Sequence, residues 1–155
     1  MLLNILAEPV SKALKRKHKT LKRLSTILKM NSNTSPQLQN MSPSDQAIQF
    51  RYAYQIQNGL DNRTMQRSLI AEEFYEFIFA VDNQGYEEEL KELADLVYVC
   101  FQYAENMEWD LEEALSRVHK SNMSKLGLDG NPIRRKDGKV LKGPNYAPPN
   151  LSDLV

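Results

Sequence analysis

The sequence is poor in the residues that build cross-links and soft metal sites. It contains one cysteine and two histidines in 155 residues. This scarcity excludes a disulfide framework and a zinc module built on Cys and His ligands, and it favours a reducing compartment such as the cytoplasm. No run of about 18 apolar residues occurs, so we expect no transmembrane helix. What remains is a chain long enough for one domain with a core of its own.

Net charge is also absent, because 20 Lys and Arg residues balance 20 Asp and Glu residues. Taken alone, this balance argues against a polyanionic partner. The average conceals a division, however. Residues 1–41 carry eight basic side chains and one acidic, which gives +7, and residues 42–155 carry 12 basic and 19 acidic, which gives −7. Each segment therefore needs its own explanation.

The basic segment, residues 1–41, is predicted to be an extension that ends in a linker. Four leucines fall on one face of a helix, at Leu14, Leu21, Leu24 and Leu28. The apolar stretch precedes the charges, which is the reverse of a secretory signal. Residues 31–40 are rich in Asn, Ser, Gln and Thr and predict a flexible linker. Residues 12–29 have the pattern of a helix that contacts nucleic acid or an anionic surface weakly, although no aromatic residue is present for base stacking.

The acidic segment has, up to residue 125, the apolar periodicity of four helices. We expect these helices at residues 43–57, 62–81, 87–106 and 110–125. The predicted N-caps are Ser42, Asn62 and Asp110. The third helix is expected to turn a set of apolar residues inward, namely Leu90, Leu93, Ala94, Val97 and Phe101. Because short connections between long helices imply antiparallel neighbours, the fold class is all-α, with residues 42–125 forming a four-helix bundle.

Residues 126–155 change in character and predict an irregular tail. The pairs Asp129-Gly130 and Asp137-Gly138 favour turns, and prolines at 144, 148 and 149 prevent regular structure. We expect at most a short hairpin in this tail. Packing against the helical domain or a partner subunit is expected to hold it in place.

Two pairs of carboxylates on consecutive predicted helices form the strongest chemical signal. Glu73 and Glu76 are three residues apart on one helix face, and Glu92 and Asp95 repeat that spacing on the next helix. Antiparallel packing would bring the four together beside apolar neighbours, where they need cations for neutralisation. Hard oxygen ligands select Mg²⁺, with Mn²⁺ as a substitute. A solvated helix surface is the plainer interpretation of either pair alone.

Two other kinds of active site are excluded. A carboxylate-bridged di-iron bundle needs Glu-x-x-His on two helices, but Ser116 stands three residues before His119, and Lys15 stands three before His18. Cys100 lies in an apolar run, so we expect it to be a core residue rather than a nucleophile.

The residues around these carboxylates resemble the MazG-like all-α nucleoside triphosphate pyrophosphohydrolases. The resemblance lies in the stretch Leu69 to Glu76 (LIAEEFYE), in Glu92-Leu93-Ala94-Asp95, and in residues 118–126 (VHKSNMSKL). With the two Asp-Gly turns and the segment 139–149, the chain is similar to the phosphoribosyl-ATP pyrophosphohydrolase-like subgroup, which is frequent in bacteria and their phages. The resemblance covers residues 43–151.

This resemblance implies a four-helix fold, a Mg²⁺-dependent reaction and a homodimer or homotetramer. Carried over by position, the metal ligands are Glu73, Glu76, Glu92 and Asp95. Asn122 and Lys125 match positions that contact substrate phosphate or sugar. Lys125, and from the tail Lys139 or Lys142, are expected to neutralise the leaving pyrophosphate, with ordinary solvation or a subunit contact as the alternative for the two tail lysines. Tyr146 either closes over the base or ribose or pins the tail to the bundle, and the pin is the favoured interpretation. If a phage encodes the chain, the compartment is the host cytoplasm.

The predicted reaction is hydrolysis of a nucleoside triphosphate to the monophosphate and pyrophosphate, and the favoured substrate is a dNTP. Water attacks the α-phosphorus, and either Glu72 or Glu76 accepts its proton. Three alternatives stay open: hydrolysis of phosphoribosyl-ATP in histidine biosynthesis, a non-catalytic nucleotide sensor, and a nucleic-acid-binding helical protein. The identity of the base depends on a pocket wall for which four aromatic residues are candidates, although the favoured interpretation of each is an ordinary core residue: Tyr52, Tyr54, Phe74 and Tyr98.

Overall fold

The computed structural model describes residue 18 and residues 21–27 and 41–155, and every regular element in these ranges is helical. The elements are α2 (Pro43–Ala53), the short 3₁₀ turn η2 (Leu60–Asn62), α3 (Arg63–Asn83), α4 (Tyr86–Asn106) and α5 (Leu111–Met123). The prediction of an all-α fold with four main helices is therefore confirmed. None of the described helices is both long and apolar enough to cross a membrane. The chain divides after Trp109 into two compact units, residues 1–109 and 110–155.

Two of the three predicted N-caps are confirmed, and one is wrong. The Ser42 and Asp110 side chains each accept a hydrogen bond, at 3.2 Å, from the backbone N–H three residues later. Asn62 makes no such bond, because its side-chain amide donates instead to the carbonyl oxygen of Gln57 at 2.7 Å. The turn η2 comes directly before α3, so the chain enters this helix from a 3₁₀ turn rather than through a side-chain cap.

The first helix ends at Ala53, earlier than the predicted Gln57, because the chain turns sharply at Gln55. Gln55 has φ of +55°, a left-handed conformation that an α-helix does not continue through. The backbone beyond the turn is held by the buried guanidinium of Arg51, which donates to the Gln57 carbonyl at 2.9 Å. This contact replaces the helical hydrogen bonds that the segment gives up.

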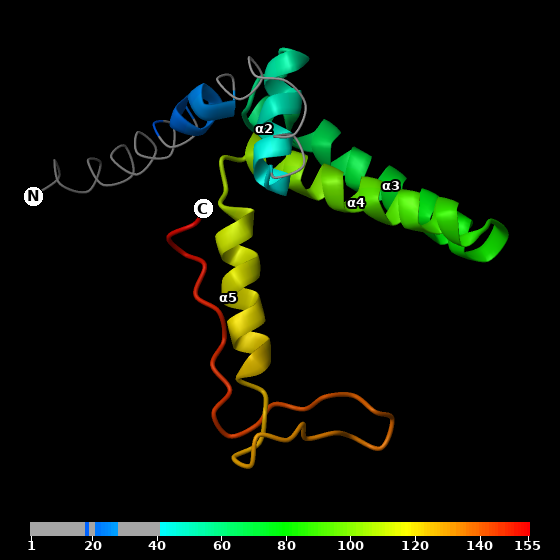
Figure 1. The fold of residues 1–155 in the computed structure, drawn as a ribbon, viewed down its shortest axis with the longest axis vertical. Helices are drawn as coiled ribbons and strands as arrows, with labels where there is room; N and C mark the ends of the chain where they lie inside the picture. Colours follow the sequence, from blue (N-terminus) through cyan, green and yellow to red (C-terminus); the bar gives the residue numbers. More distant parts are fainter. Residues whose placement is uncertain (1–17, 19–20, 28–40) are drawn as a thin grey trace, which may run out of the picture. The chain divides into compact units, whose positions relative to one another are not determined.

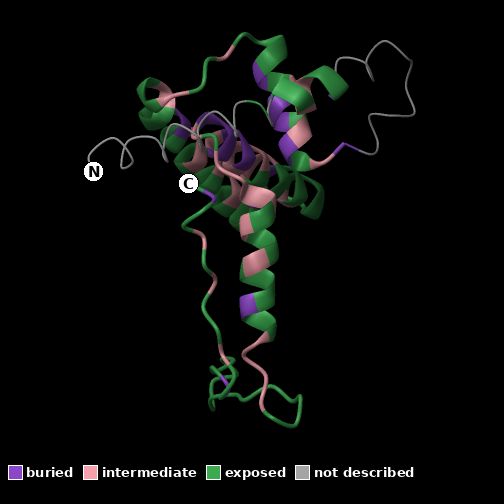
Figure 2. Cartoon of the chain, turned by 90° about the vertical axis from the view of Figure 1, so that its left-hand side faces the viewer, coloured by how far each residue is buried: buried purple, intermediate pink, exposed green. Residues whose placement is uncertain are grey.

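In the unit of residues 1–109, α3 and α4 lie side by side as an antiparallel hairpin (Figure 1). Helix α2 packs on the second half of α4, where the rings of Phe50 and Tyr98 meet edge to face at 5.9 Å. The buried residues gather in this region, as Figure 2 shows in purple, and the apolar ones on the two helices are Ala47, Ile48, Phe101 and Ala104. The core therefore lies toward the end of the hairpin that is remote from the α3–α4 turn.

A short N-terminal piece packs against α2. Ile27 is buried with Met41 and Ile48. The Arg23 guanidinium binds the Asp45 carboxylate at 2.8 Å and the Ser42 hydroxyl at 3.3 Å, so this arginine supports the start of α2. Most of residues 12–29, for which contact with nucleic acid or an anionic surface is predicted, lie outside the residues that the structure describes.

The predicted inward face of the third helix is corrected by the structure. Phe101 is buried as expected, but Leu90 is 67% exposed, and Leu93, Ala94 and Val97 are exposed as well. Among the described elements of this unit, only α3 covers the first half of α4, since α2 packs on the second half. One neighbouring helix cannot cover both the side that faces it and the apolar stripe beside that side.

In the unit of residues 110–155, the tail folds back along α5. Arg117 of α5 pairs with the Asp153 carboxylate and also donates to the Asn150 carbonyl at 2.8 Å. An isolated antiparallel bridge between Arg134 and Val140 closes a small turn, which confirms the predicted irregular tail with at most a short hairpin. The boundary predicted at residue 125 stays a prediction, although α5 and the tail group together here.

Gly143 fixes where the returning tail meets the end of α5. Its N–H donates to the Lys125 carbonyl at 2.9 Å. A Cβ at this position would collide with the backbone carbonyl oxygens of Lys125 and Leu126. Only glycine permits so close an approach of the two backbone segments.

Candidate metal and nucleotide site

Three carboxylates from two helices come together in the α3–α4 hairpin. Glu73 of α3 and the pair Glu92 and Asp95 of α4 each offer an oxygen atom within 4.8 Å of the others. The spacing of three residues places Glu92 and Asp95 about one turn apart on the side of α4 that faces α3. Antiparallel packing then brings Glu73 opposite them. We call these three residues the carboxylate cluster.

Negative charge is concentrated around Glu73 in this cluster. The pKa of Glu73 is raised, first by its partial burial and then by the neighbouring carboxylates Glu76, Asp95, Glu92 and Glu72. A raised carboxyl pKa means that the ionised form of Glu73 is disfavoured by its surroundings. A bound divalent cation would reverse this effect, because it attracts the same oxygens that repel each other.

Glu92 shows how a cation fits the cluster. It is only 8% exposed, and its Oε2 atom is buried without a hydrogen-bond partner. Its other oxygen, Oε1, accepts a hydrogen bond from the Lys91 ammonium at 2.7 Å. An unsatisfied buried carboxylate oxygen is costly unless a ligand completes it. Three oxygen donors of this type suit a hard cation such as Mg²⁺ or Mn²⁺, so the residues present fit the metal that the sequence predicts.

Glu72 and Glu76, the two candidates for the general base, lie beside the cluster and not in it. Both are exposed on α3. Both are near enough to act electrostatically on Glu73, Glu76 more strongly than Glu72. The assignment of Glu76 as a fourth metal ligand, and the choice between the two glutamates as base, remain predictions.

All the residues predicted to contact substrate lie in the second unit. Lys125 donates to the Asn122 side chain at 2.7 Å, so these two candidates are neighbours at the end of α5. The Lys142 ammonium lies 4.2 Å from the centre of the Tyr146 ring, a cation–π contact within the tail. Lys139 is exposed, and its backbone N–H donates to Asp137 at 3.1 Å. Their contact with a nucleotide stays a prediction.

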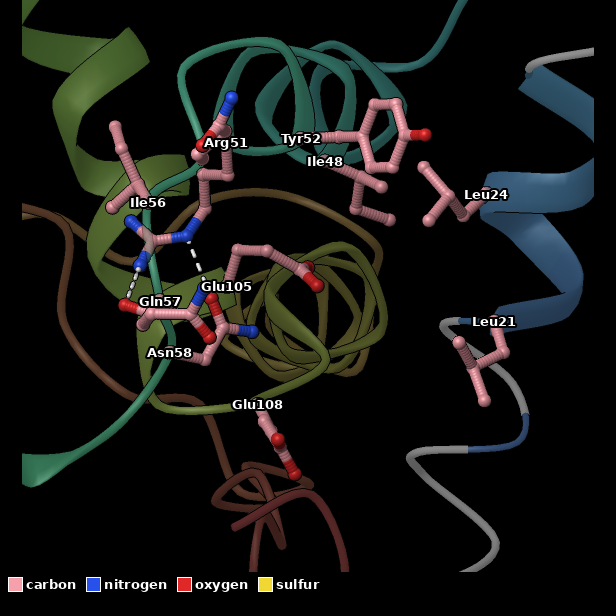
Figure 3. Close-up of a pocket in the computed structure, with 11 residues that line it drawn as sticks. Leu21, Leu24, Ile48, Arg51, Tyr52, Ile56, Gln57, Asn58, Glu105 and Glu108 are labelled. Atoms are coloured by element: carbon pink, nitrogen blue, oxygen red, sulfur yellow. Dashed lines mark hydrogen bonds between the residues drawn. The ribbon is translucent and has the colours of Figure 1, made fainter.

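Near the end of α4 lies a cavity of about 550 Å³ (Figure 3). Ile48 and Tyr52 line it from α2, and Glu105 lines it from α4. Of the four aromatic residues considered for a base pocket, Tyr52 alone lines this cavity. Tyr52, Tyr54 and Phe74 are exposed, so their interpretation as core residues is wrong, and Tyr98 is half-buried. Glu105 follows Asp95 by ten residues, which corresponds to about 15 Å of helix rise.

The sequence interpretation missed two polar residues in the hairpin interior. Gln66 and Gln102 are buried, and the amide oxygen of each has no hydrogen-bond partner. Gln66 precedes Glu73 by seven residues and Gln102 follows Asp95 by seven, so each lies about 10 Å along its helix from the cluster, on nearly the same face. The sequence does contain a signal for both residues. Each is a polar residue inside an apolar pattern, seven positions from a predicted metal ligand.

Cys100 behaves as predicted for a residue of the interior. Its thiol is half-buried, and burial raises its pKa. A thiol of this kind is a poor nucleophile at neutral pH, because the reactive species is the thiolate. Nucleophilic catalysis through Cys100 therefore finds no support in its surroundings.

The comparison with known protein families agrees with this geometry. A family model described as phosphoribosyl-ATP pyrophosphohydrolase matches residues 52–122, a range that contains α3, α4 and the whole carboxylate cluster. No curated protein matches the chain. Members of the matched family are pyrophosphohydrolases, so an activity of the nucleoside triphosphate pyrophosphohydrolase type is implied. The chain thus contains a domain of the phosphoribosyl-ATP pyrophosphohydrolase family, which is part of the MazG-like nucleoside triphosphate pyrophosphohydrolase superfamily.

Proposed function

We propose that the chain hydrolyses a deoxynucleoside triphosphate to the monophosphate and pyrophosphate, with Mg²⁺ held by Glu73, Glu92 and Asp95. The observation that carries the proposal is the buried, unpartnered Oε2 of Glu92 inside a three-carboxylate cluster. A purely solvated acidic surface would leave such an oxygen in contact with water. The family of the domain supports the same class of reaction.

In the proposed reaction, the oxygen of a water molecule forms a bond to the α-phosphorus, and the bond from that phosphorus to the bridging oxygen breaks. The electron pair leaves with pyrophosphate, and the proton of the water passes to a carboxylate of Glu72 or Glu76. When bound, the metal supplies charge neutralisation and polarisation of the phosphoryl group. Glu73, Glu92 and Asp95 would hold that ion, and Glu76 is the proposed fourth ligand.

The second unit supplies cationic side chains to the proposed reaction. Lys125, Lys139 and Lys142 are proposed to neutralise the charge that develops on pyrophosphate, and Asn122 to contact phosphate or sugar. Tyr146 is proposed to close over the nucleoside. Its ring lies beside the Lys142 ammonium, so these two proposed substrate contacts are neighbours in the tail.

The proposal is tested by measuring pyrophosphate release with Mg²⁺ over a panel of substrates. The panel comprises the canonical dNTPs, damaged dNTPs, ribonucleotides and phosphoribosyl-ATP. Glu92→Gln removes one ligand charge with little change of shape, and Glu88→Gln, an exposed glutamate of the same helix, is the matched control. We expect loss of turnover in the first variant only. Unchanged turnover in folded Glu92→Gln would overturn the metal site, and exclusive hydrolysis of phosphoribosyl-ATP would select the alternative substrate.

We also propose a homodimer or homotetramer that covers the exposed apolar side chains of α3 and α4. On α3, Phe74, Ile78 and Val81 follow each other at spacings of four and three residues, and all three are exposed. On α4, Leu90, Leu93 and Val97 follow each other at spacings of three and four residues and are exposed as well. Large exposed apolar patches mark interaction sites in soluble proteins.

Light scattering coupled to size exclusion tests this assembly. We expect the wild-type mass to equal two or four chains, and Ile78→Asp to shift it toward one chain. Leu128→Asp is the control, since Leu128 is an exposed leucine outside the two helices. A wild-type protein that runs as a monomer at high concentration would refute the proposed assembly.

A further inference from the structure

One cation is already present at the carboxylate cluster, and it belongs to the chain itself. The Lys91 ammonium lies 2.7 Å from Glu92 Oε1 and 3.3 Å from Asp95 Oδ2. These are two of the three residues that offer oxygens to a metal. Lys91 therefore binds two of the carboxylates that a divalent cation would need as ligands.

The two ion pairs have unequal partners. The Glu92 side chain is 11% exposed, whereas that of Lys91 is 57% exposed. A buried carboxylate cannot leave its place without disturbing the packing of α4 against α3. A lysine on a flexible four-carbon stem in contact with solvent can turn away at little cost. If one member of the group moves, it is Lys91.

A divalent cation and the Lys91 ammonium oppose each other at these oxygens. Both are positive, and a metal bound to Glu92 and Asp95 would lie only a few ångströms from an ammonium that stayed in place. Coulomb repulsion at such a distance favours exchange of one cation for the other. The ammonium released in this way is free to pair with another anion, and the proposed reaction brings a multivalent one, the triphosphate of the substrate.

We propose that Lys91 is an exchangeable counter-ion of the carboxylate cluster. In the metal-free protein it neutralises Glu92 and Asp95. When the divalent cation binds, Lys91 is displaced, and its ammonium then pairs with a phosphate group of the nucleotide. Lys91 thus exchanges its carboxylate partners for a substrate phosphate, and the second step of this inference rests on the proposed function.

The first step is tested without catalysis, by measuring Mn²⁺ binding to the full chain by electron paramagnetic resonance or calorimetry with no nucleotide present. Lys91→Met keeps the aliphatic stem and removes the competing charge, so we expect Mn²⁺ to bind about two- to fivefold more tightly, the size of an exposed ion pair. The thermal midpoint of the metal-free variant should fall at the same time. Lys91→Arg keeps the charge and should retain an affinity close to the wild-type value. Lys136→Met, an exposed lysine of the second unit, controls for the loss of one positive charge.

The second step is tested at saturating Mg²⁺ on a dNTP that the wild-type protein hydrolyses. We expect Lys91→Met to raise KM severalfold with a smaller change in kcat, and Lys91→Arg to restore KM. An unchanged KM would overturn the transfer of Lys91 to phosphate. Mn²⁺ affinity that is unchanged or weaker in Lys91→Met would overturn the exchange.

These outcomes separate the inference from the proposed function. If the wild-type protein binds Mn²⁺ and Glu92→Gln does not, the metal site stands, and the Lys91 result is decided on its own. If the wild-type protein binds no Mn²⁺, both the metal site and the exchange are wrong. Should Lys91→Met fail to fold, Lys91→Gln serves as the neutral variant in the same measurements.

Discussion

Arg51 and Glu92 are two buried charged side chains in the same unit, but they differ in how fully they are hydrogen-bonded. Arg51 is 3% exposed and donates to Asn58, Gln57 and Asn106 at 2.7 to 2.9 Å, which Figure 3 shows in part. Glu92 is 8% exposed and leaves one carboxylate oxygen without a partner. Burial of a charge with a full set of hydrogen bonds serves the fold. Burial of a charge with an open bonding position points to a ligand.

The largest expected effect is the loss of stability on replacing Arg51. Arg51→Met removes the arginine donor from the Asn106 and Asn58 side-chain oxygens. It also removes one of the two side-chain donors to the Gln57 carbonyl. We expect the free energy of unfolding, measured by urea denaturation, to fall by about 3 kcal/mol or more. Arg67→Met, an exposed arginine of α3, should change it by less than about 0.5 kcal/mol. A stable Arg51→Met protein would show that the network adds little to the fold.

The next effect concerns Glu92, where we expect a large loss of activity and only a small change in stability. Glu92→Gln should lower Mg²⁺-dependent turnover by about 100-fold or more, which corresponds to roughly 2.7 kcal/mol of transition-state stabilisation. The metal-free stability should change by less than about 1 kcal/mol, because the glutamine keeps the shape and one repulsive charge is lost. Kinetics and urea denaturation on the same preparation check both statements. A loss of stability equal to that of Arg51→Met would remove the contrast between the two residues.

Adding and removing the metal sharpens the contrast further. At a Mg²⁺ concentration of 100 times Kd, binding to the native state adds about 2.7 kcal/mol of stability, which for a chain of this size is a rise of roughly 5–10 °C in Tm. A chelator should reverse the rise. Glu92→Gln should show none of it, and Arg51→Lys, if folded, should keep it. A Tm that does not respond to Mg²⁺ would speak against the cluster as a metal site.

The smallest effect is expected on the metal-free stability when Glu73 is replaced. Its pKa is raised by burial and by its carboxylate neighbours, so the ionised side chain weakens the metal-free protein at neutral pH. Glu73→Gln should therefore raise the metal-free Tm slightly, by roughly 1–2 °C, and abolish the response to Mg²⁺. Differential scanning calorimetry with and without chelator measures both. A lower Tm in the metal-free variant would show that the carboxylate is stabilised by its surroundings.

The helices were predictable wherever local chemistry determines them. Ser42 and Asp110 cap their helices as the sequence predicts, and the spacing of the carboxylates brings three of the four predicted ligands together. Lys91 was missed, although its position four residues before Asp95 is an ordinary helical ion-pair spacing. Lys91 directly precedes Glu92 in the sequence.

Features that depend on tertiary partners could not be predicted in this way. Arg51 looks like a surface residue of a helix, and only the fold of residues 54–59 shows that its acceptors arrive from the following loop and from Asn106. The exposed stripe of Leu90 and Val97 follows from which helices surround α4, and periodicity carries no information about that. A 3.6-residue pattern identifies an apolar face and leaves its neighbour unspecified.

The close approach at Gly143 makes this residue the closing point of a loop. Lys125 precedes Lys142 and Tyr146 by 17 and 21 residues, and the hydrogen bond from Gly143 to the Lys125 carbonyl brings the two ends of the intervening segment together. Because this position has no room for a methyl group, its tolerance to substitution is set by backbone geometry and not by chemistry. One atom added there would change the spacing of three candidate substrate contacts at once while touching none of their side chains.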